Sequence, residues 1–388
     1  MTSAFADTFY FLALLDSQEK RHAQAAEAQP LKPLEPSRQM NKHKLLAVFV
    51  GCLMVVIALW TLLKAQRPGG DSVIQALQAG YRRPIGTLSE QEKARTKADE
   101  VVRRLGTNAL PQYIRWLRAK DSPIKARLLR LLEQQHLIRV DTSKMSADWR
   151  RFYAYIAISI LGPDARAAIP AISQSVRDRR AEEKGAAALL LAGIGREPIG
   201  FLTNALHDPD MQVRVAAARG LGAYGETHAN AWGIALPPRS QEEIANTARM
   251  VVRPLVNALA DTNNNNYFRA VAVSALGQIA HDEESAKSAV PVLLRSLEDP
   301  DPDVGVMAAQ SLGWIAREPS VAVPALAAQV NAGNATLRRV CVEALGRFGS
   351  RAESAVPVLL KALDDADANV QHEAAYALGR VKPKTPPE

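Results

Sequence analysis

The sequence predicts an all-α protein, an α-solenoid of about seven stacked helical pairs preceded by a single transmembrane helix. Three observations carry this prediction. A Val-Pro and Leu-Gly pattern returns every 33 residues towards the C-terminus. Ala and Leu, both strong helix formers, recur throughout, whereas aromatic residues make up only 5% of the chain. Residues 45–63 form an uncharged apolar run.

Residues 1–39 are interpreted as a tail and linker. The stretch from Phe5 to Asp16, FADTFYFLALLD, resembles the opening of a PIN-domain ribonuclease, in which a buried strand delivers the first metal-binding aspartate, here Asp7. The resemblance covers about 27 residues, and the other acidic residues that a two-metal nuclease needs have no counterpart. We therefore predict no nuclease, and interpret the stretch as a fusion remnant or as sequence ahead of a start at Met40.

The run from Leu45 to Leu63 predicts a membrane anchor. Its 19 residues carry no charge, and a helix of that length crosses about 30 Å of hydrocarbon. Trp60 lies near one end, where an interfacial aromatic residue is expected. A buried core helix, a cleaved signal peptide, and cleavage with lipid attachment at Cys52 are the alternatives.

The orientation of this anchor follows less directly from the sequence. Basic residues flank the apolar run about equally on both sides, so the positive-inside rule gives no clear preference. A short N-terminal tail ahead of a first apolar segment usually stays inside. We therefore expect a single-pass protein of a bacterial inner membrane, with its solenoid in the periplasm.

After the anchor, residues 71–105 predict capping helices, residues 106–382 the repeats, and residues 383–388 a polar tail. In three units a proline precedes a Leu-Gly pair by 21 residues, and successive prolines lie 33 residues apart. These units start at Pro291, Pro324 and Pro357. Earlier units follow the pattern with drift, and they start near Pro111, Pro170, Ile199 and Pro254.

Each part of the unit has a physical reason. Proline has no N–H to donate, so it favours the first turn of the first helix. An Asp-rich turn, as at residues 299–302, ends that helix. Small residues on the second helix allow close approach of its neighbours. The Leu-Gly pair either ends this helix or, because glycine has no side chain, lets a neighbouring helix pack closely there. Such a pair cannot bury its apolar face alone and must stack.

The second helices carry the pattern Val-Arg-x-x-Ala-x-x-x-Leu-Gly, which is complete from Val213 to Gly222. This pattern resembles the HEAT and HEAT-like families, and among them the short lyase-type repeats, over roughly residues 106–382. The resemblance implies an α-solenoid whose second helices line a concave face. It is specific for the fold and says little about function.

We expect a non-catalytic scaffold or adaptor that holds a protein or peptide on the concave face. The alternative for an arginine at the start of a second helix is a pair with an aspartate of the neighbouring turn, such as Asp208. Residues 226–248 lengthen one connection, and Asn263 to Asn266 predict a solvated turn. The candidate contact residues are Arg214, Arg219, Arg269, Arg338, Arg339, His372 and, in the long connection, Trp232.

An enzyme is the alternative class. The stretch around His372-Glu373 resembles the metal motif of the HEAT-repeat deoxyhypusine hydroxylases, in which several His-Glu pairs converge on two irons, but here the pair occurs once. The lyase-type resemblance implies bilin attachment or removal in some relatives. No Ser-His-Asp order, phosphate loop or HExxH motif is present, and the two cysteines, Cys52 and Cys341, provide no zinc site. We therefore predict no catalytic residue, metal or cofactor.

The formal net charge of +8 is unevenly distributed. Residues 161–388 carry 23 Lys and Arg against 26 Asp and Glu, which makes nucleic acid an unlikely partner for the solenoid. The excess lies in residues 82–139, where solvated helix faces, an acidic partner, anionic lipid and, last, nucleic acid are the alternatives. The membrane-proximal basic residues are Arg103, Arg104, Arg115, Arg118, Lys120, Lys125, Arg127 and Arg130.

Overall fold

The computed structural model describes residues 71–81, 88–122, 146–178, 181–225 and 239–381, and all regular secondary structure in these ranges is helical. The predictions for residues 1–39, 45–63 and 383–388 lie outside the described residues. The chain divides into a unit ending at Gln75 and a unit from Ala76 to Glu388.

The N-terminal part of the second unit contains single helices rather than a regular repeat. Tyr81, at the end of α3, donates a 2.6 Å hydrogen bond to Asp99 on α4. The helix α7 packs on α5 and α9. The second helix that the sequence pattern predicts near Leu132 lies outside the described residues. The elements are α3 (Asp71–Tyr81), α4 (Leu88–Leu105), η1 (Gly106–Ala109), α5 (Leu110–Leu117), α7 (Ala147–Leu161) and η3 (Gly162–Ala168).

From α8 onwards the described chain forms helical pairs. Each first helix is followed, across a short turn, by a second helix that packs antiparallel on it. The pairs are α8 (Ile169–Asp178) with α9 (Ala181–Ile194), α10 (Ile199–Ala205) with α11 (Met211–Gly222), α12 (Gln241–Leu259) with α13 (Asn266–Ile279), α14 (Glu283–Ser296) with α15 (Pro302–Ile315), α16 (Pro319–Ala332) with α17 (Ala335–Phe348), and α18 (Val356–Ala362), preceded by η4 (Gly349–Ala355), with α19 (Ala368–Val381).

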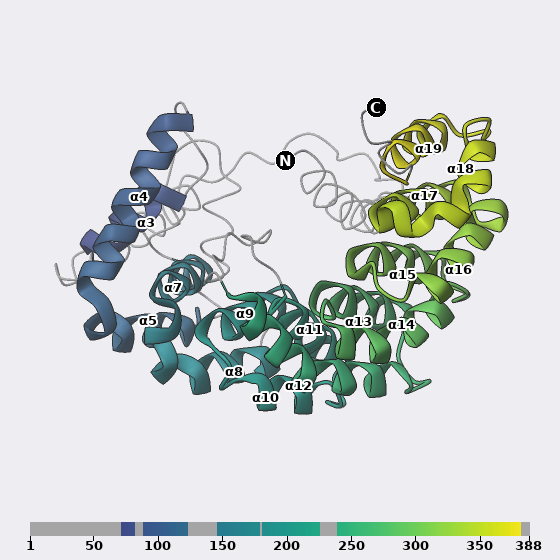
Figure 1. Ribbon diagram of the computed structural model, residues 1–388. Helices are drawn as coiled ribbons and strands as arrows, with labels where there is room; N and C mark the ends of the chain where they lie inside the picture. The colour runs from purple at the N-terminus through teal and green to yellow at the C-terminus, as the bar shows by residue number, and fades with distance from the viewer. Residues whose placement is uncertain (1–70, 82–87, 123–145, 179–180, 226–238, 382–388) are drawn as a thin grey trace, which may run out of the picture. The chain divides into compact units, whose positions relative to one another are not determined.

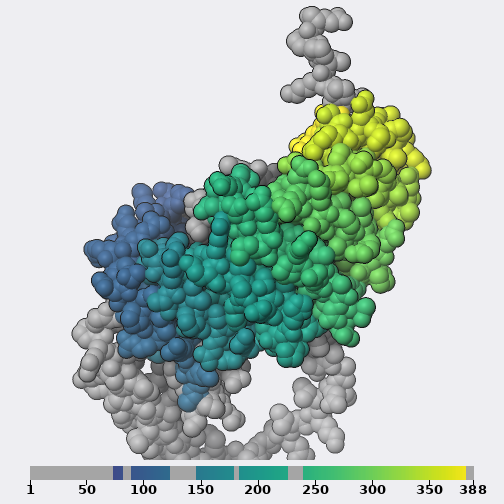
Figure 2. Space-filling model, turned by 60° about the horizontal axis from the view of Figure 1, so that its bottom comes forward, coloured from purple at the N-terminus to yellow at the C-terminus, as the bar shows by residue number. Residues whose placement is uncertain are grey.

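The pairs stack into two rows. The second helices α9, α11, α13, α15, α17 and α19 lie side by side, and each packs closely on the next; we call them the second-helix row (Figure 1). The first helices make fewer contacts with one another. The space-filling view shows successive repeats lying against each other in chain order (Figure 2). Because each repeat is covered mainly by its neighbours, the core is a continuous apolar layer rather than a single centre.

At Gly222, Gly277, Gly313 and Gly346, the glycine of a Leu-Gly pair is a point of close approach to the next second helix. A Cβ on Gly277 would lie 2.4 Å from Ser311 Oγ, and one on Gly313 would lie 2.9 Å from Ala344 Cα. Both α13 and α15 continue beyond their glycine, to Ile279 and Ile315. Of the two predicted roles for Leu-Gly, these helices therefore use it for close packing.

The turns of successive repeats share one geometry because side chains cap the start of the second helices. Asp210, Asn265, Asp301 and Asn334 each accept a hydrogen bond from a backbone N–H two or three residues later, at 2.8 to 3.0 Å. These bonds satisfy donors that the first turn of a helix leaves unpaired. Short Asp- and Asn-containing turns therefore set where each second helix begins.

Three sequence expectations about helix starts need correction. Pro254, Pro291 and Pro324 lie inside their helices, because caps further upstream, such as Asp282 on α14, start those helices before the proline. The expectation holds for Pro357, which lies in the first turn of α18.

A complete capping box is formed by Ser240 and Glu243 at the start of α12. Part of the long connection at residues 226–248 is therefore helical, because α12 starts at Gln241.

One apolar stretch among the described residues, 147–178, is long enough to cross a membrane, with a mean hydropathy of 1.2. Half of its most apolar window is buried inside the protein, which also fits a core helix, so it is weak evidence for a span. Tyr153 and Tyr155 are buried there, Trp149 stacks on Tyr153, and Trp116 of α5 is 9% exposed. Trp116, Tyr153 and Tyr155 therefore belong to the core.

Candidate functional site

Three of the predicted contact arginines occupy the same position in their repeats. Arg214, Arg269 and Arg338 each stand four residues after the cap of a second helix. At this position a long side chain reaches back over its own turn and across to the turn of the next repeat. The structure therefore places them at the turn edge of the second-helix row.

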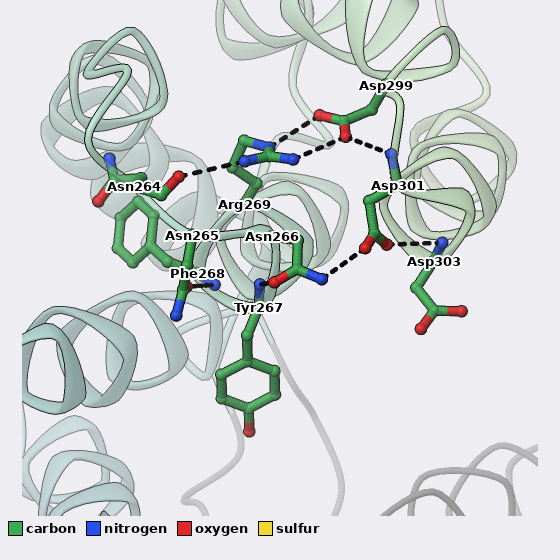
Figure 3. A network of polar contacts seen from close by, with 9 residues as sticks. All are labelled: Asn264, Asn265, Asn266, Tyr267, Phe268, Arg269, Asp299, Asp301 and Asp303. Carbon is green, nitrogen blue, oxygen red and sulfur yellow. Dashed lines mark hydrogen bonds and ion pairs between the residues drawn. The ribbon is translucent and has the colours of Figure 1, made fainter.

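The pair Arg269–Asp299 shows the arrangement most clearly (Figure 3). The Nε and Nη2 atoms of Arg269 donate to the two carboxylate oxygens of Asp299, each at 2.8 Å. Its Nη1 atom donates to the backbone carbonyl of Asn264 at 3.1 Å. The side chains are only 26% and 12% exposed. Such a bidentate pair is stronger and more directional than an ordinary surface ion pair.

The other junctions repeat this contact with variations. Arg338 binds both carboxylate oxygens of Asp365, at 2.8 and 2.6 Å, and the carbonyl of Gly333. Arg214 donates to Asn264 Oδ1 at 3.1 Å and to the backbone carbonyl of Asp208 at 2.7 Å. The partner in the next turn is thus Asn264, and Asp208 contributes its backbone rather than its carboxylate.

A fourth cation in this set was missed by the sequence analysis. Lys184, near the start of α9, is 4% exposed, and it donates to Asp210 at 2.9 Å and to the carbonyl of Arg177 at 2.5 Å. Its position before an acidic turn in the next repeat was the available signal. We call Lys184, Arg214, Arg269 and Arg338, with the turn groups they bind, the turn ladder.

The ladder changes the acidity of its carboxylates. Burial alone would raise the pKa of Asp299, but hydrogen bonds from Arg269 and from the N–H of Asp301 outweigh it, so the pKa lies below its usual value. The hydrogen bond from Arg338 lowers the pKa of Asp365 in the same way. These aspartates therefore stay ionised at neutral pH, so their ion pairs with Arg269 and Arg338 remain intact.

The turn ladder lacks this contact, which we call a rung, at one junction between neighbouring repeats. Between α15 and α17, the position four residues after the cap Asp301 is Gly305, and the turn ahead of α17 carries Ala332 where three other turns carry Asp208, Asp299 and Asp365. In the described part of the chain, no side-chain hydrogen bond or ion pair joins α15 to this turn. Ala316 and Glu318, in the connection between α15 and α16, have positive φ angles of 42° and 52°.

The predicted polar turn at Asn263 to Asn266 is only partly solvated. Asn264 is 5% exposed and donates to the carbonyl of Ala258 at 2.7 Å, while Asn265 caps α13. Asn266 is exposed and donates to Asp301 of the next repeat at 2.5 Å. The turn is therefore a structural junction, which corrects the expectation of a free tip.

The other predicted contact residues have varied surroundings. Arg219 donates to Tyr267 Oη at 3.0 Å, and Arg339 lies 3.7 Å from Glu343, with 39% of its side chain exposed. His372 is exposed, whereas its neighbour Glu373 is half-buried, and burial together with Glu343 raises the pKa of Glu373.

Trp232 lies outside the described residues. Within the described ranges, no three His, Cys, Asp or Glu side chains gather as a set of metal ligands.

A second set of side chains on the second-helix row does not take part in the turn ladder. The positions nine and thirteen residues after each cap fall on one side of these helices, and at α15, α17 and α19 they are at least partly exposed. Sequence reasoning missed this whole set, although the repeat register could have found it. We call it the mid-row surface, and its residues are Gln310, Trp314, Glu343, Arg347, Tyr376 and Arg380.

Tyr376 is the most exposed apolar side chain of this surface, at 61%. Arg347 pairs with Glu343 on its own helix at 2.9 Å, which leaves the guanidinium partly exposed and held in place. The half-exposed Met307 borders the surface on α15. The surface therefore combines aromatic rings and methionine with charges that are already paired.

The membrane-proximal basic set is only partly described. Arg103, Arg104, Arg115, Arg118 and Lys120 are all exposed. Lys125, Arg127 and Arg130 lie outside the described residues.

Comparisons with known proteins agree with the repeat geometry. Residues 252–333 and 323–387 match the family model described as HEAT repeats, and residues 199–228 match a HEAT repeat. No curated protein matches the chain significantly. The chain is a HEAT-repeat α-solenoid.

Solved structures show the same fold at low identity. The crystal structure of Kap121p matches with a TM-score of 0.50 and 14% identity over 80% of this chain, and the match spans 33% of Kap121p, so the likeness concerns a third of that protein. An engineered protein matches with a TM-score of 0.40 and 20% identity, over 81% of this chain and 88% of that one. Another match, at a TM-score of 0.49 and 15% identity over the same 80% and 33%, is the karyopherin Kap121p bound to the SUMO protease Ulp1p.

Proposed function

We propose that this HEAT-repeat α-solenoid is a non-catalytic scaffold that holds a protein or peptide across the mid-row surface. HEAT-repeat solenoids typically mediate protein–protein interactions through an extended face. The observation that carries the proposal is the presence of Trp314, Arg347 and Arg380 at equivalent positions on three neighbouring second helices, with Tyr376 one turn earlier on α19, all at least partly exposed. Trp, Tyr and Arg are the residues most enriched at binding hot spots.

The turn ladder supports this proposal by separating two roles on the same helices. Cations four residues after the caps are committed to the turns, so they hold the helices in register. The positions nine and thirteen residues after the caps then form a preorganised surface whose side chains need little ordering on binding. Neighbouring packed helices lie about 8–10 Å apart, so a segment crossing α15, α17 and α19 would span roughly 20 Å.

Site-specific photocrosslinking in cells tests this assignment. A photoreactive amino acid at Gln310, on the second-helix row, is expected to give discrete protein adducts. The same group at Met250 or Val321, which are exposed on the first helices α12 and α16, serves as the control. Trp314→Ala is expected to reduce the Gln310 adducts at least fivefold, since losing a buried hot-spot side chain costs about 1–2 kcal/mol or more. Equal adducts at all three positions would refute the assignment.

The finer part of the proposal is a tether: residues 45–63 anchor the scaffold in the membrane, with the repeats outside the cytoplasm. The uncharged run and its flanking cations support this part. A C-terminal tag tests it by protease digestion of intact cells and of cells with an opened outer envelope. Cleavage only after opening supports a periplasmic solenoid, whereas survival of the tag until the inner membrane is broken places the solenoid in the cytoplasm.

A further inference from the structure

The cations on α4 and α5 differ from those of the turn ladder in one respect. Arg103, Arg104, Arg115, Arg118 and Lys120 are exposed, and none of them makes a hydrogen bond or ion pair in the described part of the chain. By contrast, the ladder cations each bind two or more acceptors. The unpaired cations keep their whole charge available to a partner.

These five residues are close together in the fold. Arg103 and Arg104 occupy the last turn of α4, and the short η1 leads directly into α5. Arg115 lies in the last turn of α5 and Arg118 follows as its C-cap, whereas Tyr113 and Trp116 of the same helix are buried. An eight-residue helix is about 12 Å long, so the cations at the end of α5 lie only a short helix away from the end of α4.

Nearby acidic side chains do not outnumber these cations. Residues 100–122 contain five cations and two acids, the exposed Glu100 on α4 and Asp121. The carboxylate of Asp121 accepts a 2.7 Å hydrogen bond from the N–H of Ala147 at the start of α7, where a negative charge is favoured by the helix terminus. With Glu100 counted, the cations of this region still exceed its acids.

We propose that this α4–α5 face docks on an anionic lipid surface. An array of unpaired cations complements anionic headgroups by charge alone. Nucleic acid fits less well, because the neighbouring rings of Tyr113 and Trp116 are buried and offer no stacking platform. Along the chain, the face begins 40 residues after Leu63, the end of the uncharged run.

Arginine-selective labelling of the full chain tests the proposal. The protein is bound to vesicles of phosphatidylcholine alone, or with about 30% phosphatidylglycerol, and labelled with phenylglyoxal before peptide mass spectrometry. Each cation near an anionic surface contributes about fivefold in binding, so labelling of Arg115 and Arg118 should slow at least fivefold on anionic vesicles. Arg253 and Arg295, exposed on the first helices, are the internal controls and should label at the same rate on both.

The expected protection disappears at about 0.5 M salt, because screening shortens the range of the attraction. The experiment measures the labelling rate of individual arginines. It therefore reports contact of this face with lipid even if residues 45–63 hold the chain on both kinds of vesicle. The double variant Arg115→Glu with Arg118→Glu should abolish protection of Arg103 and Arg104, whereas Arg253→Glu with Arg295→Glu, of equal charge change, should leave it intact. Equal labelling on both vesicles, or protection by duplex DNA but not by vesicles, would overturn the proposal.

Discussion

Breaking the Arg269–Asp299 rung is expected to destabilise the stack measurably. Arg269→Ala removes two hydrogen bonds to a carboxylate and one to a backbone carbonyl. A hydrogen bond to a charged group contributes about 1.5–3 kcal/mol to stability. Because both side chains keep some contact with water, we take the lower part of this range and expect a loss of about 2–3 kcal/mol, with a pairwise coupling of about 1.5–2 kcal/mol.

The assay is a double-mutant cycle with Arg269→Ala, Asp299→Ala and the double variant. Unfolding in urea is followed by circular dichroism in a non-ionic detergent, and only variants with an unchanged m value are compared. The matched control is the Lys287–Glu283 pair, which has the same charges at 2.7 Å, with side chains 61% and 74% exposed, and which should show no measurable coupling. Equal coupling in the two cycles would refute the view that the rung holds neighbouring repeats together.

Three further predictions follow from the repeat geometry. The wild-type chain should lose stability as the pH falls below about 4, because the lowered pKa of Asp365 contributes stability only while the carboxylate is ionised, and Asp365→Asn should flatten this acid limb of the urea midpoint. Glu373→Gln should raise the urea midpoint at pH 7 and leave it unchanged near pH 3.5; the raised pKa of Glu373 means that its ionisation opposes folding once the pH exceeds about 4.3, and an equal gain at both pH values would contradict this. Gly313→Ala should lower stability by about 1–3 kcal/mol, since its Cβ would lie 2.9 Å from the next second helix, whereas Gly379→Ala, which meets nothing within 4 Å, should be neutral or slightly stabilising.

Much of the fold can be predicted from the sequence because the same buried face returns in every repeat. The 33-residue period and the Leu-Gly pairs identify the helical pairs and the points of close approach. Helix starts are harder, because they depend on caps that need not match the repeat. Ser240 and Glu243 were a readable signal, yet the long connection around them obscured it.

The candidate site was less predictable. The sequence identifies Arg269 and Arg338 as candidate contact residues. Only the structure shows that each forms an ion pair with an aspartate in a turn of the next repeat. The mid-row residues Trp314 and Tyr376 were missed, because their exposure depends on the rotational phase between neighbouring helices rather than on composition. The partner of Lys184 lies one repeat away, so Lys184 can be identified only by comparing its repeat with the acidic turn of the next one.

The missing rung at Gly305 indicates where this chain can be divided most easily. A cut after α13 would leave the guanidinium of Arg269 without its carboxylate, whereas a cut in the connection after α15 separates no such pair. The connection itself holds Ala316 and Glu318 in left-handed backbone geometry, which a chain break would relax. A nick or a domain inserted between Ala316 and Pro319 should therefore leave two halves that still associate through the Gly313 crossing, which makes this the natural point for split-protein reporters.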